Sequence, residues 1–93
     1  MESSPNSFEF SSLIEARAQL DAIDLELMAT LQKRMELVVA VQAWKKQHDI
    51  SAFDPEREKQ IIENLQRDFP KIPPKVVKDI YQIIFANVCS ANL

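Results

Sequence analysis

The 93-residue chain contains no glycine, one cysteine and one histidine. At average usage, a chain of this length would carry about six or seven glycines. Their absence argues against phosphate-cradling loops, dinucleotide fingerprints and glycine-turned hairpins, because these need positive backbone dihedrals or close approach of the backbone. Cys89 cannot form an internal disulfide, and Cys89 and His48 alone cannot complete a protein-only zinc site of three or four ligands. We therefore expect no metal site.

The chain also lacks an excess of positive charge and a long apolar run. Eleven lysines and arginines stand against 14 acids, a formal net charge of −3, so no global basic field favours a nucleic-acid backbone. No run approaches ~18 apolar residues, and the first ten residues lack the basic region and apolar core of a signal peptide. We therefore expect a cytoplasmic protein without a nucleic-acid or membrane partner.

The pattern of apolar residues predicts an all-α fold with three helices. No stretch alternates with period two, and good helix formers dominate. Residues 1–10 are polar and without periodicity, which predicts a disordered leader, followed by one helical domain over residues 11–93.

The first expected helix is too long for its own domain. It begins at a capping box, Ser12 with Glu15, and neither proline nor glycine interrupts it before Gln47. A helix of roughly 35 residues is about 53 Å long, whereas a globule of this chain length is about 32 Å across. A two-fold partner that uses the same helix is the simplest cover for its apolar side.

Prolines mark the other two expected helices. Asp54 caps a second helix with Pro55 at its first position, and this helix continues to about Asp68. Pro70, Pro73 and Pro74 then break the chain, and a third helix runs from about residue 75 to the end.

Charged residues interrupt the apolar stripe of the long helix. Heptad spacing selects Leu13, Arg17, Leu20, Asp24, Leu27, Leu31, Arg34, Val38, Val41 and Lys45. Long cationic side chains can reach the rim of such an interface, and seam charges can fix its register. Alternatively, the cations gather around a ligand.

An antiparallel pair of these helices would bring the cations together. Pairing about a midpoint near residue 29 places Arg17 of one chain opposite position 41 of the other, between Arg34 and Lys45. The same pairing sets Asp24 opposite Arg34. Clustered cations repel unless an anion lies among them. We therefore expect a pocket for a small, multiply charged anion, built from both subunits.

The start of the second helix adds a cation and acids to this set. The motif Asp54-Pro55-Glu56-Arg57-Glu58 is good capping chemistry with solvated charges on one interpretation. On the other, a carboxylate beside an anion site holds a hydroxyl or amine of the ligand.

The ordered set of these residues resembles the all-helical chorismate mutase family from about Leu13 to Asn92. The matching stretches are ARAQLDAIDLELMATLQKRMELVVAVQAWK, FDPEREKQIIENL and IYQIIFANV. The resemblance implies an intertwined antiparallel homodimer of three-helix protomers with two shared active sites. It implies an isomerase that rearranges chorismate to prephenate without a cofactor, in aromatic amino acid biosynthesis.

The resemblance also implies roles for individual residues. Arg17 of the partner chain and Arg34 would hold the two carboxylates, and Lys45 would bond the ether oxygen and one carboxylate. Glu58 would take the ring hydroxyl. The residues expected to line the rest of the site are Asp54, Arg57, Val41, Ile61, Val88 and Asn92.

The last helix departs from the family's pattern, which places a small hydroxyl residue and then a glutamine one turn later. Val88 and Asn92 stand at these positions. Val88 removes a polar contact, and Asn92 offers the same amide on a stem one methylene shorter. By the resemblance, Asn92 would be the catalytic amide for the ether oxygen.

Two other functions remain open from the sequence. The same fold could act on a related substrate, as an aminodeoxychorismate mutase or an isochorismate pyruvate-lyase. Lyase-type members tend to lack the acidic pair that this chain has as Asp54 and Glu58, which favours the mutase. The other possibility is a weakly active or non-enzymatic helical dimer, which is favoured by Val88 in place of the family's hydroxyl residue.

Overall fold

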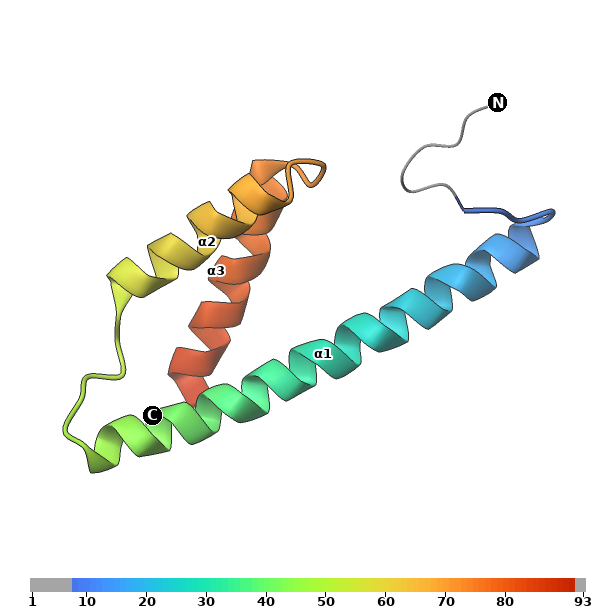
Figure 1. Cartoon of the computed structure of the whole chain (residues 1–93). Helices are drawn as coiled ribbons and strands as arrows, with labels where there is room; N and C mark the ends of the chain where they lie inside the picture. The colour runs from blue at the N-terminus through green and yellow to red at the C-terminus, as the bar shows by residue number, and fades with distance from the viewer. Residues whose placement is uncertain (1–7, 92–93) are drawn as a thin grey trace. The chain divides into compact units, whose positions relative to one another are not determined.

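The computed structural model describes the backbone of residues 8–91 and the side chains of residues 8–87. These residues form three helices joined by short connections: α1 (Leu13–Gln47), α2 (Pro55–Asp68) and α3 (Pro74–Ala91) (Figure 1). No strand occurs in the part of the chain that is described. The prediction of an all-α fold with a very long first helix is confirmed.

α1 begins with hydrogen bonds that differ by one residue from the expected capping box. The Ser12 hydroxyl accepts from the backbone N–H of Glu15 at 3.1 Å, as expected. The Glu15 carboxylate, however, accepts from the backbone N–H of Ser11 at 2.8 Å rather than from Ser12. The Ser11 hydroxyl also donates to the Glu15 carboxylate, at 3.5 Å, so a serine at this position favours the shift.

Residues 8–10 lie against the first turns of α1. The side-chain amide of Gln19 donates to the backbone carbonyl of Glu9 at 2.8 Å. Phe8 and Phe10 line a hollow of about 270 Å³ together with Leu20 and Ile23. Residues 1–7, the larger part of the expected leader, lie outside the described residues, and its disorder stays a prediction.

α1 ends in a turn that usually requires glycine. Asp49 has φ of 56°, in the left-handed region. The backbone N–H of Ile50 donates to the Lys45 carbonyl at 2.8 Å, and that of Asp49 donates to the Lys46 carbonyl at 3.4 Å. These two bonds are the pattern of a Schellman cap. In a chain without glycine, an aspartate takes the position, because its short polar side chain tolerates left-handed backbone better than most residues.

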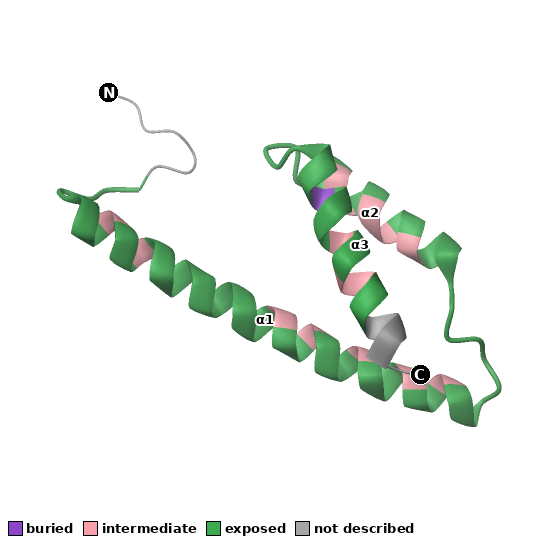
Figure 2. Ribbon diagram, turned by 180° about the vertical axis from the view of Figure 1, so that it is seen from behind, coloured by how far each residue is buried: buried purple, intermediate pink, exposed green. Residues whose placement is uncertain are grey.

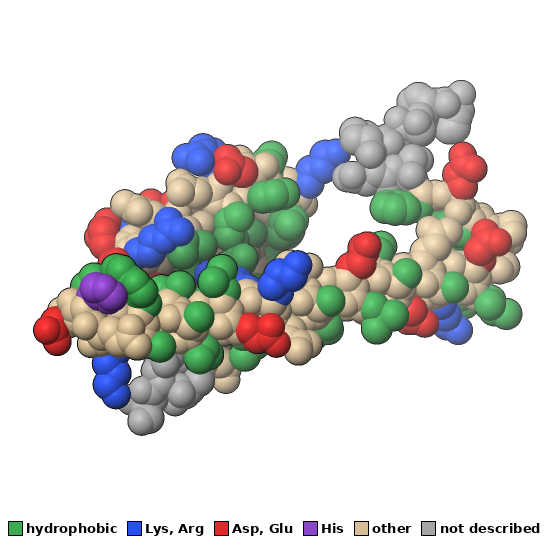
Figure 3. Space-filling model, turned by 60° about the horizontal axis from the view of Figure 1, so that its bottom comes forward, with side chains coloured by type: hydrophobic (Ala, Val, Ile, Leu, Met, Phe, Trp, Pro, Cys, Tyr) green, Lys and Arg blue, Asp and Glu red, His purple; other side chains and the backbone are tan. Residues whose placement is uncertain are grey.

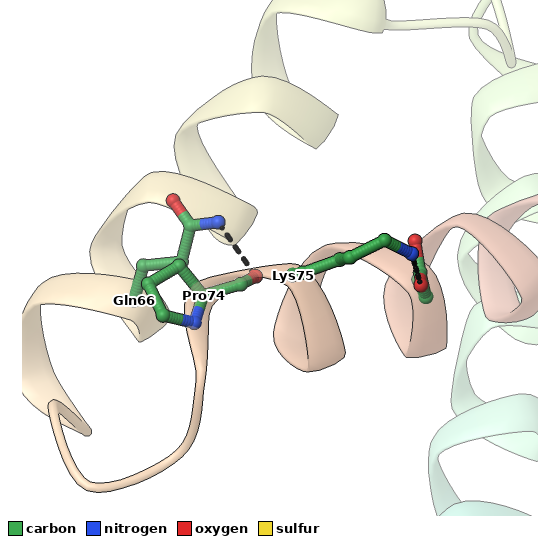
Figure 4. Close-up of polar contacts among 4 residues, drawn as sticks. Gln66, Pro74 and Lys75 are labelled. Atoms are coloured by element: carbon green, nitrogen blue, oxygen red, sulfur yellow. Dashed lines mark hydrogen bonds and ion pairs between the residues drawn. The ribbon is translucent and has the colours of Figure 1, made fainter.

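α2 and α3 form a hairpin whose connection is fixed by hydrogen bonds. The α2 helix closes with a bond from the Phe69 N–H to the Leu65 carbonyl at 2.9 Å. The Gln66 side-chain amide then donates across the connection to the Pro74 carbonyl at 2.9 Å (Figure 4). α3 begins at Pro74, one residue before the expected start, since proline suits the first position of a helix.

Little of the protomer is buried. Among the side chains described, Val77 in the first turn of α3 is the one buried residue, at 5% exposure (Figure 2). Along α1, by contrast, large apolar side chains remain exposed (Figure 3). Leu20 is 58% exposed and Leu27 is 62% exposed. Burying one such side chain contributes about 1.5–3 kcal/mol. The apolar surface of α1 is therefore available for burial against another chain.

Candidate active site

The three cations expected to bind the ligand lie on α1. Arg17 is exposed, whereas Arg34 and Lys45 are half-buried. Arg34 and Lys45 are 11 residues apart, which is about three helical turns, so an α-helix presents them on nearly the same side. Val41, expected to form an apolar wall, is 40% exposed.

The start of α2 holds the acidic part of the predicted site. Asp54 caps the helix: its Oδ1 accepts from the Arg57 N–H at 3.0 Å, and its backbone carbonyl accepts from the Glu58 N–H at 3.1 Å. Pro55 occupies the first turn. The motif can cap the helix and bind a ligand at the same time. The cap uses one carboxylate oxygen of Asp54, and it fixes the backbone from which the side chains of Arg57 and Glu58 extend.

Glu58 lines a groove of about 700 Å³ between α2 and α3. Lys59, Lys78 and Gln82 line it as well, over apolar side chains that include Ile62 and Phe85. Of the predicted site residues whose side chains are described, Glu58 alone lines this groove. Ile61, three residues after Glu58, is half-buried. Lys78 and Gln82 are not among the predicted site residues; their spacing of four residues places them on one side of α3.

Two ion pairs among the described residues involve no predicted site residue. Lys75 pairs with Asp79 at 2.6 Å (Figure 4), and Arg67 pairs with Asp68 at 3.1 Å. Arg17, Lys45 and Arg57 have no carboxylate partner within residues 8–91. Their positive charge is therefore available to an anion.

Gln42 is a polar residue of α1 that the heptad pattern did not select. It is half-buried, four residues after Val38 and three before Lys45, which are half-buried too. Its side-chain oxygen Oε1 is buried and accepts no hydrogen bond from the described part of the chain. Spacing of three and four residues is the sequence signal that could have placed Gln42 beside Lys45.

Two predicted residues at the end of α3 are not placed. Asn92 lies outside the described residues, and α3 includes Val88 without its side chain being described. Their predicted roles stay predictions.

Neither a metal-binding cluster nor a membrane-spanning helix occurs among the described residues. Groups of three or more histidine, cysteine, aspartate or glutamate side chains placed to hold a metal ion do not occur there. None of the described helices combines the length and apolar character needed to cross a membrane.

Comparisons with known proteins identify the family. The T-protein of Enterobacter agglomerans is 29% identical over 72 residues, 75% of this chain and 19% of that protein. The chain thus spans about a fifth of the length of this relative. No solved structure matches. Residues 16–92 match the model of chorismate mutase type II, and the chain belongs to this family.

Proposed function

We propose that the protein catalyses the rearrangement of chorismate to prephenate, on the route to phenylalanine and tyrosine, as a homodimer with two shared sites. The observation that carries this proposal is the family match over residues 16–92, which spans every residue expected in the site. The placement of Lys45 and Arg34 on α1, with Glu58 in the first turn of α2, supports it.

The proposed residues perform this reaction by holding the substrate. The rearrangement is pericyclic, so bonds form and break within one molecule and no nucleophile or proton carrier is required. Arg34 and the partner subunit's Arg17 bind the two carboxylates and fold the enolpyruvyl side chain over the ring. Fixing reacting atoms at about 3–3.5 Å replaces a rare conformer by a bound one, which can lower the barrier by several kcal/mol.

Lys45 acts on the charge that develops as the ether bond breaks. Negative charge gathers on the ether oxygen in the transition state, and a preorganised ammonium group stabilises it more than it stabilises the ground state. Glu58 accepts a hydrogen bond from the ring hydroxyl and so fixes the orientation of the ring. Val41 and Ile61 form apolar walls that strengthen these interactions by excluding water.

The exposed apolar surface of α1 supports the antiparallel homodimer. A chain of 93 residues with one buried side chain among those described lacks the core that a stable monomer of this size needs. A second α1 would bury leucines that the protomer exposes, such as Leu20 and Leu27. The same pairing would bring Arg17 to the partner's site.

An assay with chorismate tests the proposal. The purified protein is incubated with chorismate, the loss of its diene absorbance is followed, and the product is identified by mass spectrometry and NMR. Prephenate is the expected product. Release of pyruvate, or turnover of only the amino analogue of chorismate, would assign a related substrate. No turnover by a folded dimer would reject the proposal in favour of a non-enzymatic helical dimer.

A further inference from the structure

The segment before α1 folds back onto the start of this helix. The side-chain amide of Gln19 donates to the backbone carbonyl of Glu9 at 2.8 Å, across ten residues of sequence. The side chains that line the hollow formed by the segment and the helix are Phe8, Phe10, Ala16, Gln19, Leu20 and Ile23. We call residues 8–12 the N-terminal clamp, because they contact the helix on the same chain.

The clamp covers the part of α1 that is half-buried near its start. Of residues 13–30, all of which the structure describes, Ala16 and Gln19 are half-buried and the others are exposed. Both of these residues line the hollow together with Phe8 and Phe10. The reduced exposure in this stretch of α1 is thus confined to residues that the clamp contacts.

Arg17 lies between the two points at which hydrogen bonds join the clamp to the helix. It is the fifth residue of α1. Two residues earlier, the Glu15 carboxylate accepts from the Ser11 N–H at 2.8 Å. Two residues later, Gln19 donates to the Glu9 carbonyl. The first turns of a helix fray when little packs against them, because the first four N–H groups have no partner within the helix. Bonds on both sides of Arg17 therefore keep its backbone helical.

The clamp leaves the side chain of Arg17 accessible. The α1 residues that line the hollow are spaced by three and one, which places them on one side of the helix. Arg17 does not line the hollow, and its side chain is exposed. A carboxylate can therefore reach the guanidinium group. Because the backbone beneath it is held, less conformational entropy is lost when the ligand binds.

We propose that the N-terminal clamp positions Arg17 for the substrate by holding the first turns of α1 helical. Gln19 is the positioning residue of the clamp, through its bond to the Glu9 carbonyl. This inference rests on the proposed function, which assigns Arg17 to a substrate carboxylate. It gives a role to Gln19, Phe8 and Phe10, which the heptad pattern and the family resemblance leave without one.

Amide hydrogen exchange, followed by mass spectrometry without substrate, tests the clamp itself. Gln19→Met keeps the length of the side chain and removes the donor, and one net hydrogen bond changes an equilibrium by roughly threefold to tenfold. We therefore expect the amides of residues 13–20 to exchange faster by this factor, while those of α2 keep wild-type rates. Gln47→Met, at an exposed position in the last turn of α1, is the matched control and should change neither. Wild-type exchange in Gln19→Met would overturn the inference.

The two aromatic rings are tested in the same way. Phe8→Ala combined with Phe10→Ala removes apolar contacts from the hollow and should speed up exchange of residues 13–20 by about tenfold. Ile14→Ala is the control, since Ile14 is 79% exposed and does not line the hollow. If the double variant exchanges no faster than Ile14→Ala, the rings do not hold the helix, and the inference is wrong.

A double-mutant cycle with Arg17→Ala tests whether the clamp acts through Arg17. In the wild-type background, Gln19→Met should raise both the KM for chorismate and the dissociation constant of prephenate about threefold to tenfold, with kcat changed by about twofold or less. In the Arg17→Ala background, the same substitution should have almost no effect on the binding of prephenate. Equal effects in both backgrounds would mean that the clamp only stabilises the fold, which would overturn the proposed positioning.

The two kinds of measurement separate this inference from the proposed function. If the wild-type protein binds neither chorismate nor prephenate, the proposed function fails, and the positioning of Arg17 for that substrate fails with it. Faster exchange in Gln19→Met would still show that the clamp holds α1. If the protein turns over chorismate but the exchange of residues 13–20 is unchanged in Gln19→Met, the proposed function stands and the clamp is rejected.

Discussion

The α2–α3 hairpin and α1 obtain their stability in different ways. The hairpin has a capped start at Asp54, a connection held by the Gln66–Pro74 bond, and the buried Val77. α1 has well-formed ends, but most of its leucines are exposed. Because helices are stabilised mainly by packing of an apolar face, α1 depends on a surface that one protomer does not supply. This difference supports the proposal that the dimer interface, and with it the proposed shared site, lies on α1.

The largest expected effect is that of replacing Lys45 on α1. Lys45→Ala should lower kcat by about 10²–10³, because removing one preorganised donor to a developing negative charge has this cost. The measurement is the initial rate of chorismate loss, with circular dichroism to verify folding. Lys46→Ala is the matched control, since Lys46 is an exposed neighbour in the last turn of α1. Near-normal turnover by Lys45→Ala would reject the proposed role.

Mixing two inactive variants tests whether α1 serves its partner. Arg17→Ala and Lys45→Ala subunits, refolded together, should form mixed dimers in which one of the two sites regains both cations. With statistical mixing, activity should return to about a quarter of wild type, because half of the dimers are mixed and each has one intact site. Activity that stays at the level of the separate variants would place Arg17 in its own chain's site.

A pair of leucine variants compares two sides of α1. Leu27, in the heptad stripe, is 62% exposed in the protomer, and Leu25, outside the stripe, is 74% exposed. Leu27→Ala should lower the free energy of unfolding by about 2–5 kcal/mol, as at a buried leucine, whereas Leu25→Ala should change it by about 0.5 kcal/mol or less. Urea denaturation at several protein concentrations measures both. Equal small effects would mean that the stripe is not an interface.

Within the hairpin, the effect of the α2 cap should be smaller. Asp54→Ala removes the acceptor for the Arg57 N–H and should cost about 1 kcal/mol of stability. Asp54→Asn keeps an N-cap acceptor and should retain most of it. Thermal unfolding followed by circular dichroism measures both variants. A melting temperature unchanged in Asp54→Ala would leave ligand binding as the role of this carboxylate.

The smallest effect is expected where α1 ends. Asp49→Gly should raise the free energy of unfolding by about 0.5–1 kcal/mol, because glycine adopts the left-handed conformation without a Cβ penalty. Chemical denaturation measures the change. If Asp49→Gly lowered the free energy of unfolding, the interactions of the aspartate side chain would stabilise the protein by more than its left-handed backbone destabilises it.

Helix starts were predictable from the sequence because their chemistry is local. The side chains of Ser12 and Asp54 can each accept a hydrogen bond from the backbone N–H three residues later. They do so at 3.1 and 3.0 Å. The end of α1 was harder to predict from the sequence, because the residue in the left-handed conformation is Asp49 and not the glycine that is usual there. Local chemistry therefore defined the elements more reliably than it defined the turns.

The candidate site was predictable only in part. The family pattern supplied Lys45 and Glu58 as expected site residues, and their roles stay predictions. The heptad rule passed over Gln42 because it selects one narrow stripe on α1. The half-buried residues Val38, Gln42 and Lys45 instead follow spacings of four and three. No spacing rule indicates that one side-chain oxygen of Gln42 is buried.

The aromatic pair at the end of α1 offers a convenient reporter. Trp44, the one tryptophan of the chain, stacks on His48 with ring centroids 3.9 Å apart, and the His48 Nδ1 lies 2.8 Å from the Trp44 carbonyl. The intrinsic fluorescence of the protein therefore originates next to Lys45. Titrating an anionic ligand while recording indole emission would follow occupancy directly, without a label and without turnover.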